Sequence, residues 1–340
     1  MLTNVEKPEI LYLSKKDILE LGGGHSDLYV NAIHRAFELH AEGNFVQPLK
    51  PYLRSRGKDG HIADRIIAMP AHIGHPGISG IKWVGSKHDN PRRRGLERAS
   101  ALIILNDPET NYPIAIMEGS LISGMRTAAV TVVASRFLAK PGFKQISCIG
   151  CGVIARMQLF SMIEQFPQIE TIHLFDLSPA AADQLSQAIR EKAPHVRVKC
   201  CQSVEEAVKQ GEVVITCTVA EQPYIPFDWI QEGTFISNVS IMDFHKEVFL
   251  KADKVIVDDW EQSNREKKVI HQLVLEGKFS REQLHAELGE IVTGQKPGRE
   301  NDQEIILLNP MGMAIEDIAC AEKIYHEALK KGIGTKLSLY

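Results

Sequence analysis

The amino-terminal third of the chain mixes one helical hydrophobic pattern with several short alternating runs. In Ser26–Glu42, apolar side chains recur every three to four positions, which predicts an amphipathic helix with Ser26 as its cap. The runs that follow are separated by Gly, Pro and Asn, and they predict strands at Ile66–Met69, Ile78–Val84, Ser100–Leu105 and Ile114–Met117. We therefore expect a sheet with flanking helices in this part of the chain.

Beyond Ser123 the pattern changes to regularly alternating helices and strands. Thr127–Leu138 predicts a helix that Pro141 and Gly142 end. The expected strands are Gln145–Ile149, Thr171–Phe175, Arg197–Cys200, Val213–Thr218, Thr234–Val239, Lys254–Val257 and Glu304–Leu308, and the expected helices are Ile154–Gln165, Pro179–Lys192, Val204–Gln210 and a last one running to Lys330. This alternation predicts an α/β fold with a Rossmann-type, doubly wound parallel sheet, beside a second domain of α+β type.

Length and charge narrow the class of protein. A chain of 340 residues suits two domains. It has 39 Lys and Arg against 43 Asp and Glu, so its net charge of -4 offers no positive field to nucleic acid or anionic lipid. The longest apolar stretch, near Thr127–Ala139, contains Arg136 and is shorter than the roughly 20 residues of a spanning helix. Because the N-terminus also lacks the apolar run of a secretory signal, we expect a cytoplasmic protein that binds neither nucleic acid nor membrane.

The six cysteines do not follow a disulfide or metal-binding pattern. Most lie in apolar runs, which is typical of reduced, buried thiols. Cys148 and Cys151 form a C-x-x-C, but no second pair stands at ligand spacing and Cys151 falls inside a glycine loop. We therefore expect no metal site. Arg92, Arg93 and Arg94, between Pro91 and Gly95, predict a solvated loop. We interpret His25, His61, His72, His88 and His245 as surface or hydrogen-bonded histidines rather than catalysts.

A glycine loop predicts a dinucleotide site. The strand ending at Ile149 runs into Gly150-Cys-Gly152-Val153-Ile154-Ala155, a G-x-G-x-x-A at a strand-to-helix turn, where free N–H groups at the helix start can hold a pyrophosphate. Asp176 ends the next strand and can accept hydrogen bonds from ribose hydroxyls, which favours NAD over NADP. The alternative is that the glycines serve only the turn and Asp176 caps the helix at Pro179.

Two further groups of residues each allow two interpretations. Thr216 and Thr218 lie at the carboxyl end of the fourth strand, where the ligand crevice of such a sheet opens, so they either contact the cofactor or cap backbone. Lys82, Arg126 and Asp243 are ionisable residues in otherwise apolar or small-residue surroundings. Burial of a charge without a partner is costly, so these three belong either to structural ion pairs or to a polar site.

The segment ILNDPETNYPIAIMEGSLISGMRTAAVTVVAS resembles the hallmark segment of the ornithine cyclodeaminase/mu-crystallin family. QPLKPYLR, MPAH, GIKWVGSKHDNP, the glycine loop and GMAIEDIACA also occur in family order, so the resemblance spans nearly the whole chain. It implies an NAD-dependent, usually homodimeric enzyme acting on amino acids or imines. It also implies an NAD-binding domain at residues 126–311, and a substrate-binding and dimerisation domain made of residues 1–125 with 312–340.

The resemblance assigns roles to single residues. Arg126 of RTAA would bind the substrate carboxylate, Lys82 would act at the reacting carbon as an electrostatic or proton-transfer partner, and Asp243 would be the general base. The backbone of Gly312 and Met313 would approach the nicotinamide. Glu316 and Asp317, which follow, are either acids favoured at a helix start or ligands.

Two departures from the family pattern point to a narrower subgroup. Many relatives carry Arg where this chain has Lys50, and a Gly-rich segment where it has Ser240-Ile-Met-Asp243. The segments that resemble the subgroup making 2,3-diaminopropionate for siderophores and related products are QPLKPYLR, HIADRIIAMPAHIG, KWVGSKHDNP, ISNVSIMD and NPMGMAIED. The implied reaction moves hydride from a glutamyl α-carbon to NAD, after which water cleaves the imine to 2-oxoglutarate and L-2,3-diaminopropionate.

A substrate of that kind carries three carboxylates and needs several cationic contacts. Lys50, Arg54 and Arg65 are available beside Met69 of the MPAH motif. Within the same family the alternatives are an ornithine cyclodeaminase or another amino-acid or imine oxidoreductase. A mu-crystallin-like binding protein without catalysis is the alternative from a different class.

Overall fold

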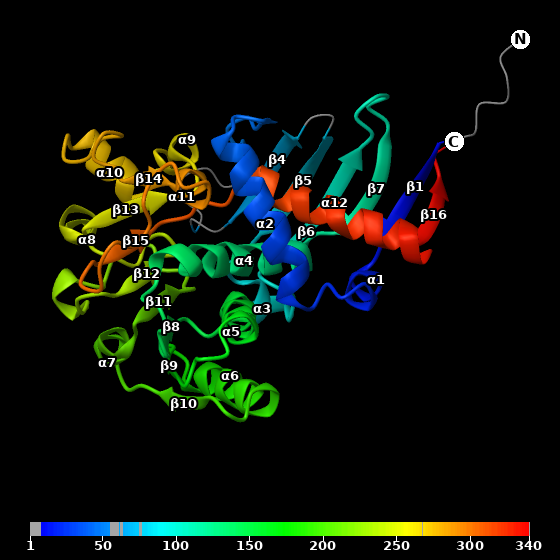
Figure 1. Ribbon diagram of the computed structural model, residues 1–340. Helices are drawn as coiled ribbons and strands as arrows, with labels where there is room; N and C mark the ends of the chain where they lie inside the picture. Colours follow the sequence, from blue (N-terminus) through cyan, green and yellow to red (C-terminus); the bar gives the residue numbers. More distant parts are fainter. Residues whose placement is uncertain (1–7, 55–60, 62–63, 75–76, 267, 340) are drawn as a thin grey trace, which may run out of the picture. The chain divides into compact units, whose positions relative to one another are not determined.

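The computed structural model describes residues 8–54, 61, 64–74, 77–266 and 268–339 (Figure 1). The chain divides into two compact units. Unit 1 is Met1–Arg126 with Met313–Tyr340, and unit 2 is Thr127–Gly312. Each unit has its own eight-stranded sheet, so each positions its functional side chains separately.

The sheet of unit 1 is mixed. Its strands are β1 (Glu9–Leu13), β2 (Phe45–Val46), β3 (Tyr52–Leu53), β4 (Arg65–Ile73), β5 (Ile78–Ser86), β6 (Ala99–Asn106), β7 (Pro113–Glu118) and β16 (Thr335–Ser338). They lie in the order β16-β1-β7-β6-β5-β4-β2, with β3 paired to β4. All pairs are antiparallel except β1 with β7. The helices that lie wholly in this unit are α1 (Lys15–Glu20), α2 (Ser26–Ala41), α3 (Asn90–Arg94) and α12 (Ala314–Lys331), and α4 (Ser120–Leu138) begins in it and continues into unit 2.

Helix α12, red in Figure 1, covers one face of this sheet. It packs on β4, β5, β6 and α2. The alternation of side chains along each strand turns Met69, Lys82 and Ile103 toward one face, in register with one another. Gly80 allows the helix to approach closely, because a Cβ there would stand 2.7 Å from Ile318 of α12. The amphipathic helix α12 therefore packs against the side chains of β5 that point to this face of the sheet.

The sheet of unit 2 is parallel throughout, which confirms the predicted fold class. Its strands are β8 (Gln145–Ile149), β9 (Thr171–Phe175), β10 (Arg197–Cys200), β11 (Val213–Thr216), β12 (Phe235–Ser237), β13 (Lys254–Val257), β14 (Ala286–Glu287) and β15 (Ile306–Leu308). They lie in the order β10-β9-β8-β11-β12-β15-β13-β14. The order reverses at β8, so the carboxyl ends of β8 and β11 border the position where such sheets bind ligands.

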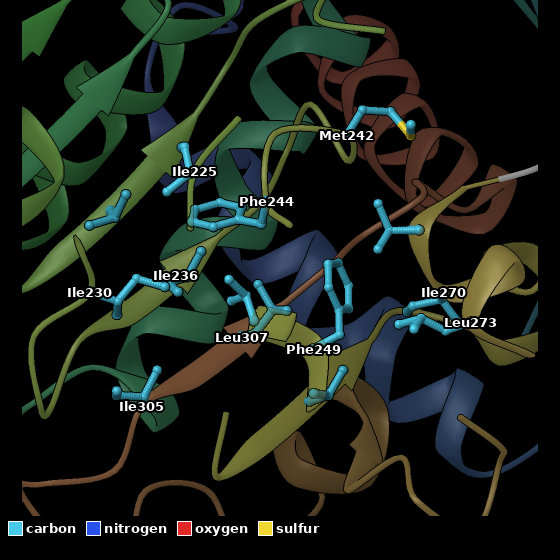
Figure 2. Packing of buried hydrophobic residues seen from close by; sticks show 14 of the residues in the cluster. Ile225, Ile230, Ile236, Met242, Phe244, Phe249, Ile270, Leu273, Ile305 and Leu307 are labelled. Carbon is cyan, nitrogen blue, oxygen red and sulfur yellow. The ribbon is translucent and has the colours of Figure 1, made fainter. Parts of the chain in front are cut away.

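Helices connect the strands of this second sheet. They are α5 (Val153–Gln165), α6 (Pro179–Lys192), α7 (Val204–Gln210), η1 (Phe227–Trp229), α8 (Lys246–Lys251), α9 (Trp260–Ser263), α10 (Val269–Leu275) and α11 (Leu288–Val292). One hydrophobic cluster of this unit joins β12, β13 and β15 to α8 and α10 (Figure 2). Phe244, Phe249 and Leu307 are buried in it. The segment around Phe244 is thereby anchored on a well-packed core.

Several predicted boundaries need correction. Helix α4 spans Ser120–Leu138 and begins seven positions before the predicted Thr127, because Glu118 accepts hydrogen bonds from the N–H groups of Ser120 and Leu121. Ser26 is the first residue of α2 rather than its cap. Arg92, Arg93 and Arg94 are exposed as predicted, but they lie in α3, which Gly95 ends in a left-handed conformation.

The apolar helix α4 is longer than the sequence pattern suggested. Its 19 residues are sufficient, by length and composition alone, to cross a membrane. In the folded chain 78% of its apolar stretch is buried within the protein itself. The position of this helix in the protein core accounts for its hydrophobicity.

Candidate active site

The turn from β8 to α5 forms a cradle in unit 2. Gly150 has φ +87°, and a Cβ there would stand 2.8 Å from the backbone of Cys217 on the neighbouring segment. A Cβ on Gly152 would meet no atom of the chain within 4 Å. Gly150 is therefore required by the fold, whereas Gly152 leaves open space in front of the first turn of α5. That is the approach a pyrophosphate needs.

Asp176 ties this turn to the end of β9. Its carboxylate accepts the N–H of Cys151 at 2.7 Å and the N–H of Ser178 at 2.8 Å. The hydrogen bond from Ser178 lies at the start of helix α6. It agrees in part with the alternative interpretation, in which Asp176 caps the helix at Pro179. The residue is only partly buried, so the same carboxylate stays open to ribose hydroxyls.

Exposed apolar side chains surround this cradle. Val153 at the start of α5, Leu177 after Asp176 and Val219 after β11 are all exposed, Leu177 to 94%. They follow the carboxyl ends of three strands of the parallel sheet. Large apolar groups exposed at such an edge suit the faces of an aromatic base. The sequence analysis selected Val153 but missed Leu177 and Val219, whose only signal was their position just after a strand end.

Thr216 and Thr218 have different surroundings. Thr216 is fully buried and donates to Asn238 at 2.9 Å, and Asn238 donates in turn to Asn309 at 2.7 Å. This chain of side chains joins the ends of β11, β12 and β15. Thr218 instead donates to the carboxylate of Asp243.

Asp243 is fully buried and held by three hydroxyl groups. Thr218 and Tyr224 donate to Oδ1, the latter at 2.7 Å, and Ser240 donates to Oδ2. Its own carbonyl accepts the N–H groups of Tyr224 and Ile225, at 2.8 and 2.9 Å. Burial, followed by the neighbouring Asp243 charge, raises the pKa of Tyr224, so this phenol remains a donor. The arrangement keeps the carboxylate in one orientation.

The loop that carries Asp243 is strained. Ile241 has φ +66°, which is costly for a β-branched residue. Met242 and Phe244 on either side of Asp243 are buried in the hydrophobic cluster and hold the loop (Figure 2). Strain held by surrounding packing is characteristic of functional sites. Tyr224 was not selected from the sequence, and Ser240 was named only as part of the segment that contains Asp243, without a role of its own.

A second cluster of charges lies in unit 1. Lys82 on β5 forms an ion pair with Asp317 of α12 at 2.7 Å and donates to Ser123 at 3.0 Å. Arg126 on α4 donates from Nε to Asp317 at 3.0 Å and from Nη1 to Glu316. All four charged side chains are buried. Glu316 and Asp317 therefore act as partners of buried cations, in addition to any dipole effect at the helix start.

The titration of this cluster follows from its burial. Burial is the main cause that lowers the pKa of Lys82 to about 8; the charges of Arg126 and Lys50 act in the same direction and Asp317 opposes them. Burial would also lower the pKa of Arg126, but Asp317 and Glu316 outweigh that effect and raise it. Lys82 can therefore gain or lose a proton near neutral pH, while Arg126 is a permanent cation.

The remaining predicted substrate residues lie in the same unit. Lys50 is buried, and Met69 stands opposite Lys82 in the β4–β5 ladder. Arg54 and Arg65 are partly exposed, and their guanidinium groups lie 5.0 and 5.3 Å from the centroid of one ring. That ring belongs to Tyr52 on β3.

Five charged side chains are buried among the described residues of this unit: Lys50, Lys82, Arg126, Glu316 and Asp317. A cluster that includes several cations in low-dielectric surroundings can accept an anionic ligand.

Gly312 and Met313 follow a turn that a buried carboxylate positions. Asp258, at the end of β13, accepts the N–H groups of Met311, at 2.8 Å, and Gly312. Gly312 has φ +74°, and Met313 is the cap residue of α12. Asp258 was not selected from sequence, where it is one of two adjacent acids after an apolar strand.

Comparison with known proteins gives a consistent result. The sequence profile described as the ornithine cyclodeaminase/mu-crystallin family matches residues 19–332. A Staphylococcus aureus protein described as N-((2S)-2-amino-2-carboxyethyl)-L-glutamate dehydrogenase is 62% identical over 333 residues, which cover 98% of this chain and 99% of that protein.

Two solved structures are similar over nearly the whole chain. One is the Thermococcus litoralis Δ1-pyrroline-2-carboxylate reductase in complex with NADH and L-proline, at 33% identity and TM-score 0.89, covering 96% of this chain and all of that one. The other is an archaeal alanine dehydrogenase dimer with bound NAD, at 33% identity and TM-score 0.86, covering 98% of this chain and all of that one.

Proposed function

The chain belongs to the ornithine cyclodeaminase/mu-crystallin family, and we propose that it is an NAD-dependent dehydrogenase of N-((2S)-2-amino-2-carboxyethyl)-L-glutamate. The net reaction consumes this amine, NAD and water, and it yields L-2,3-diaminopropionate, 2-oxoglutarate, NADH and a proton. The observation that carries the proposal is the 62% identity, without large gaps in coverage, to a protein described by that activity.

The residues of unit 2 would hold the cofactor. NAD bound there would supply the hydride acceptor for the glutamyl α-carbon. The open space at Gly152 and the N–H groups of Val153 and Ile154 suit the pyrophosphate, and Asp176 suits the ribose. In this proposal Gly150 shapes the turn, and the backbone of Gly312 and Met313 borders the nicotinamide. Thr218 contributes through Asp243, and Thr216 through its bond to Asn238.

The residues of unit 1 would hold the three carboxylates of the substrate. Arg126 keeps part of its guanidinium fork for a carboxylate after its bonds to Glu316 and Asp317, which fix its orientation. Lys50 is a further buried cation of this unit and would contact a second carboxylate of the substrate. Arg54 and Arg65, gathered on one aromatic ring, suit a more exposed carboxylate, and Met69 gives an apolar contact.

Two groups would handle protons. Asp243 can accept a proton from the substrate amine before hydride leaves and, once this proton has passed to solvent as the proton of the net reaction, a second one from the water that attacks the imine. Its three hydroxyl partners orient the carboxylate for both steps. Lys82, whose pKa is lowered to about 8, can donate a proton to the nitrogen that departs when the C–N bond breaks.

We also infer that the protein is a homodimer through the sheet face that α12 leaves uncovered. The register of the strands places Tyr12, Ile116, Ile104, Ile81 and Pro70 in one row across five strands of unit 1. A second row contains Leu102, Trp83 and Ala68. Trp83 and Leu102 are 46% and 47% exposed. A continuous apolar face of this kind suits a second copy of the same face, and a relative of known structure is described as a dimer.

Cellular context follows from the chemistry. NAD and 2-oxoglutarate are metabolites of the cytoplasm, where we place the reaction. The diamino acid product suits siderophores and related natural products. A neighbouring gene for a pyridoxal-phosphate enzyme that joins O-phosphoserine to glutamate would support this context, because that reaction supplies the substrate.

An assay of substrate choice tests the proposal. The purified protein is given NAD with the proposed substrate or with alanine, proline or ornithine, while NADH is followed by absorbance and products are identified by mass. We expect one diaminopropionate and one 2-oxoglutarate per NADH, with no ammonia. Preferred conversion of ornithine to proline and ammonia, or of alanine to pyruvate, would contradict the proposal. Binding of NAD without turnover of any of these amines would favour the non-catalytic alternative.

A further inference from the structure

A group of possible metal ligands lies in unit 1, apart from the residues used above. His61, Asp64 and His88 each offer one ligand atom, and these atoms all lie within 4.8 Å of one another. Asp64 directly precedes β4, and His88 follows the end of β5 by two positions. The three residues come from both sides of the same antiparallel strand pair, in which Arg65 is paired with Ser86.

The backbone holds two of these residues in place. The N–H of His88 donates to Oδ1 of Asp64 at 2.8 Å, and Nδ1 of His88 lies 3.0 Å from the same oxygen. Metal–ligand bonds of about 2 Å give tetrahedral ligand atoms a separation of roughly 3.3 Å. The His88–Asp64 separation is close to this value before any ion is added. The rings of His61 and His88 are stacked with centroids 4.2 Å apart and planes inclined by 18°.

The types of ligand select the class of ion. Neutral imidazole nitrogens favour Zn²⁺, Ni²⁺, Co²⁺ and Cu²⁺, whereas Mg²⁺ and Ca²⁺ prefer sites made of oxygen atoms. Two histidines and one carboxylate give three protein ligands and leave at least one position for water. The partial burial of Asp64 favours retention of the ion, and His88 remains accessible for its entry.

We propose that His61, Asp64 and His88 bind one divalent transition-metal ion of the Zn²⁺ class, which joins the start of β4 to the segment after β5. One feature opposes binding: Nζ of Lys87 lies 3.8 Å from Oδ2 of Asp64 and competes for the carboxylate. Removal of the Lys87 ammonium should therefore strengthen metal binding, whereas removal of a ligand should weaken it.

Calorimetric titration of tag-free, chelator-treated protein with Zn²⁺ tests the proposal. We expect one saturable site per chain, and no comparable site in titrations with Mg²⁺. His61→Ala and His88→Ala should each weaken Zn²⁺ binding by at least about tenfold, the loss typical even of partners outside the ligand shell. His326→Ala, which removes an exposed histidine of α12, should leave it unchanged. Lys87→Met should tighten binding, because it removes the competing ammonium.

The results separate the proposal from simpler interpretations. An absence of saturable Zn²⁺ binding to the wild type would overturn it and leave the cluster as a His–Asp pair. Equal affinity in the wild type, His61→Ala and His88→Ala would also overturn it, because the ion would then bind elsewhere. Unfolding temperatures of the metal-free variants show whether a ligand variant is folded, and Lys87→Met provides a test that keeps all three ligands. The readout is metal binding, so it does not depend on the proposed enzyme activity.

Discussion

At the scale of the residue, Asp243 is the group whose removal should affect chemistry most. In Asp243→Asn the amide keeps the size of the carboxylate and can still accept from Thr218 or Tyr224, but it cannot take a proton. We expect kcat to fall by about 10²- to 10⁴-fold, the usual contribution of a general base. NADH binding, followed by fluorescence titration, should be nearly unchanged. Turnover close to that of the wild type would remove Asp243 from the mechanism.

Lys82 should make stability depend on pH in a defined window. Its pKa is lowered by burial from 10.5 to about 8, so between these values the unfolded chain binds more protons than the folded one. The contribution of Lys82 to the free energy of unfolding therefore rises as pH increases from about 8 to about 10.5, by up to about 3 kcal/mol. Below pH 8 the residue is charged in both states and its burial cost is present in full.

The Lys82→Met variant isolates this effect. The methionine has a similar length and no charge, so the rise in stability across the window should be absent. The measurement is the unfolding midpoint of both proteins between pH 7.5 and 10.5. A difference between the two proteins that stays constant across this range would show that Lys82 does not change its proton occupancy there.

The residue scale also shows how far sequence reasoning reaches. Ionisable residues in apolar surroundings were sufficient to select Lys82, Arg126 and Asp243 from the sequence. The residues that pair with these three could not be identified from the sequence in the same way. Asp317 is 191 positions from Arg126, and the two meet only because α12 returns to the sheet of unit 1. A pattern of neighbours along the chain has no information about such a return.

At the scale of the element, the strand–turn–helix unit of β8 and α5 allows a matched pair of variants. Gly150→Ala places a methyl group 2.8 Å from the Cys217 backbone at a positive φ, so we expect lower stability of the fold itself. Gly152→Ala meets no protein atom within 4 Å and should leave the unfolding temperature nearly unchanged.

The two glycine variants should separate in the binding assay. Gly152→Ala puts a methyl group in the space assigned to the pyrophosphate, so NADH affinity should fall by at least about tenfold, or 1.4 kcal/mol. The measurements are thermal unfolding without cofactor and fluorescence titration with NADH. Full NADH affinity in Gly152→Ala would mean that the cofactor does not approach this turn.

Elements with a strong local signal were the ones predicted correctly. The bounds of β8, β9, α6, β10, α7 and β13 agree with the predicted ranges, because Gly, Pro and polar caps mark their ends. The strands β1 and β16 and the two-residue strands β2, β3 and β14 were missed. All five depend on pairing with distant strands, and the last three are too short to show a period of their own. The strand β11 ends at Thr216, which leaves Thr218 in the loop that reaches Asp243.

At the scale of the whole molecule, the proposed dimer rests on the face of the unit 1 sheet that lies opposite α12. A single exposed Trp or Leu needs no explanation, but Trp83 and Leu102 are directly paired across β5 and β6. The neighbouring row continues the apolar surface from Tyr12 to Pro70. Large exposed apolar patches on soluble proteins mark interaction sites. We therefore expect a second copy to pack against this face with its own equivalent face, so that both apolar faces are buried.

Trp83→Glu tests this assembly. The substitution puts a charge at the centre of the face, where burial in a dimer would leave it without a partner, so we expect monomers at concentrations where the wild type is dimeric. Leu275→Glu, at an exposed position of α10 in unit 2, is the matched control and should stay dimeric. Sedimentation velocity measures the mass of each. A Trp83→Glu protein that sediments as the same dimer as the wild type would place the interface elsewhere. Monomeric wild type would show that the face is not covered by a second copy.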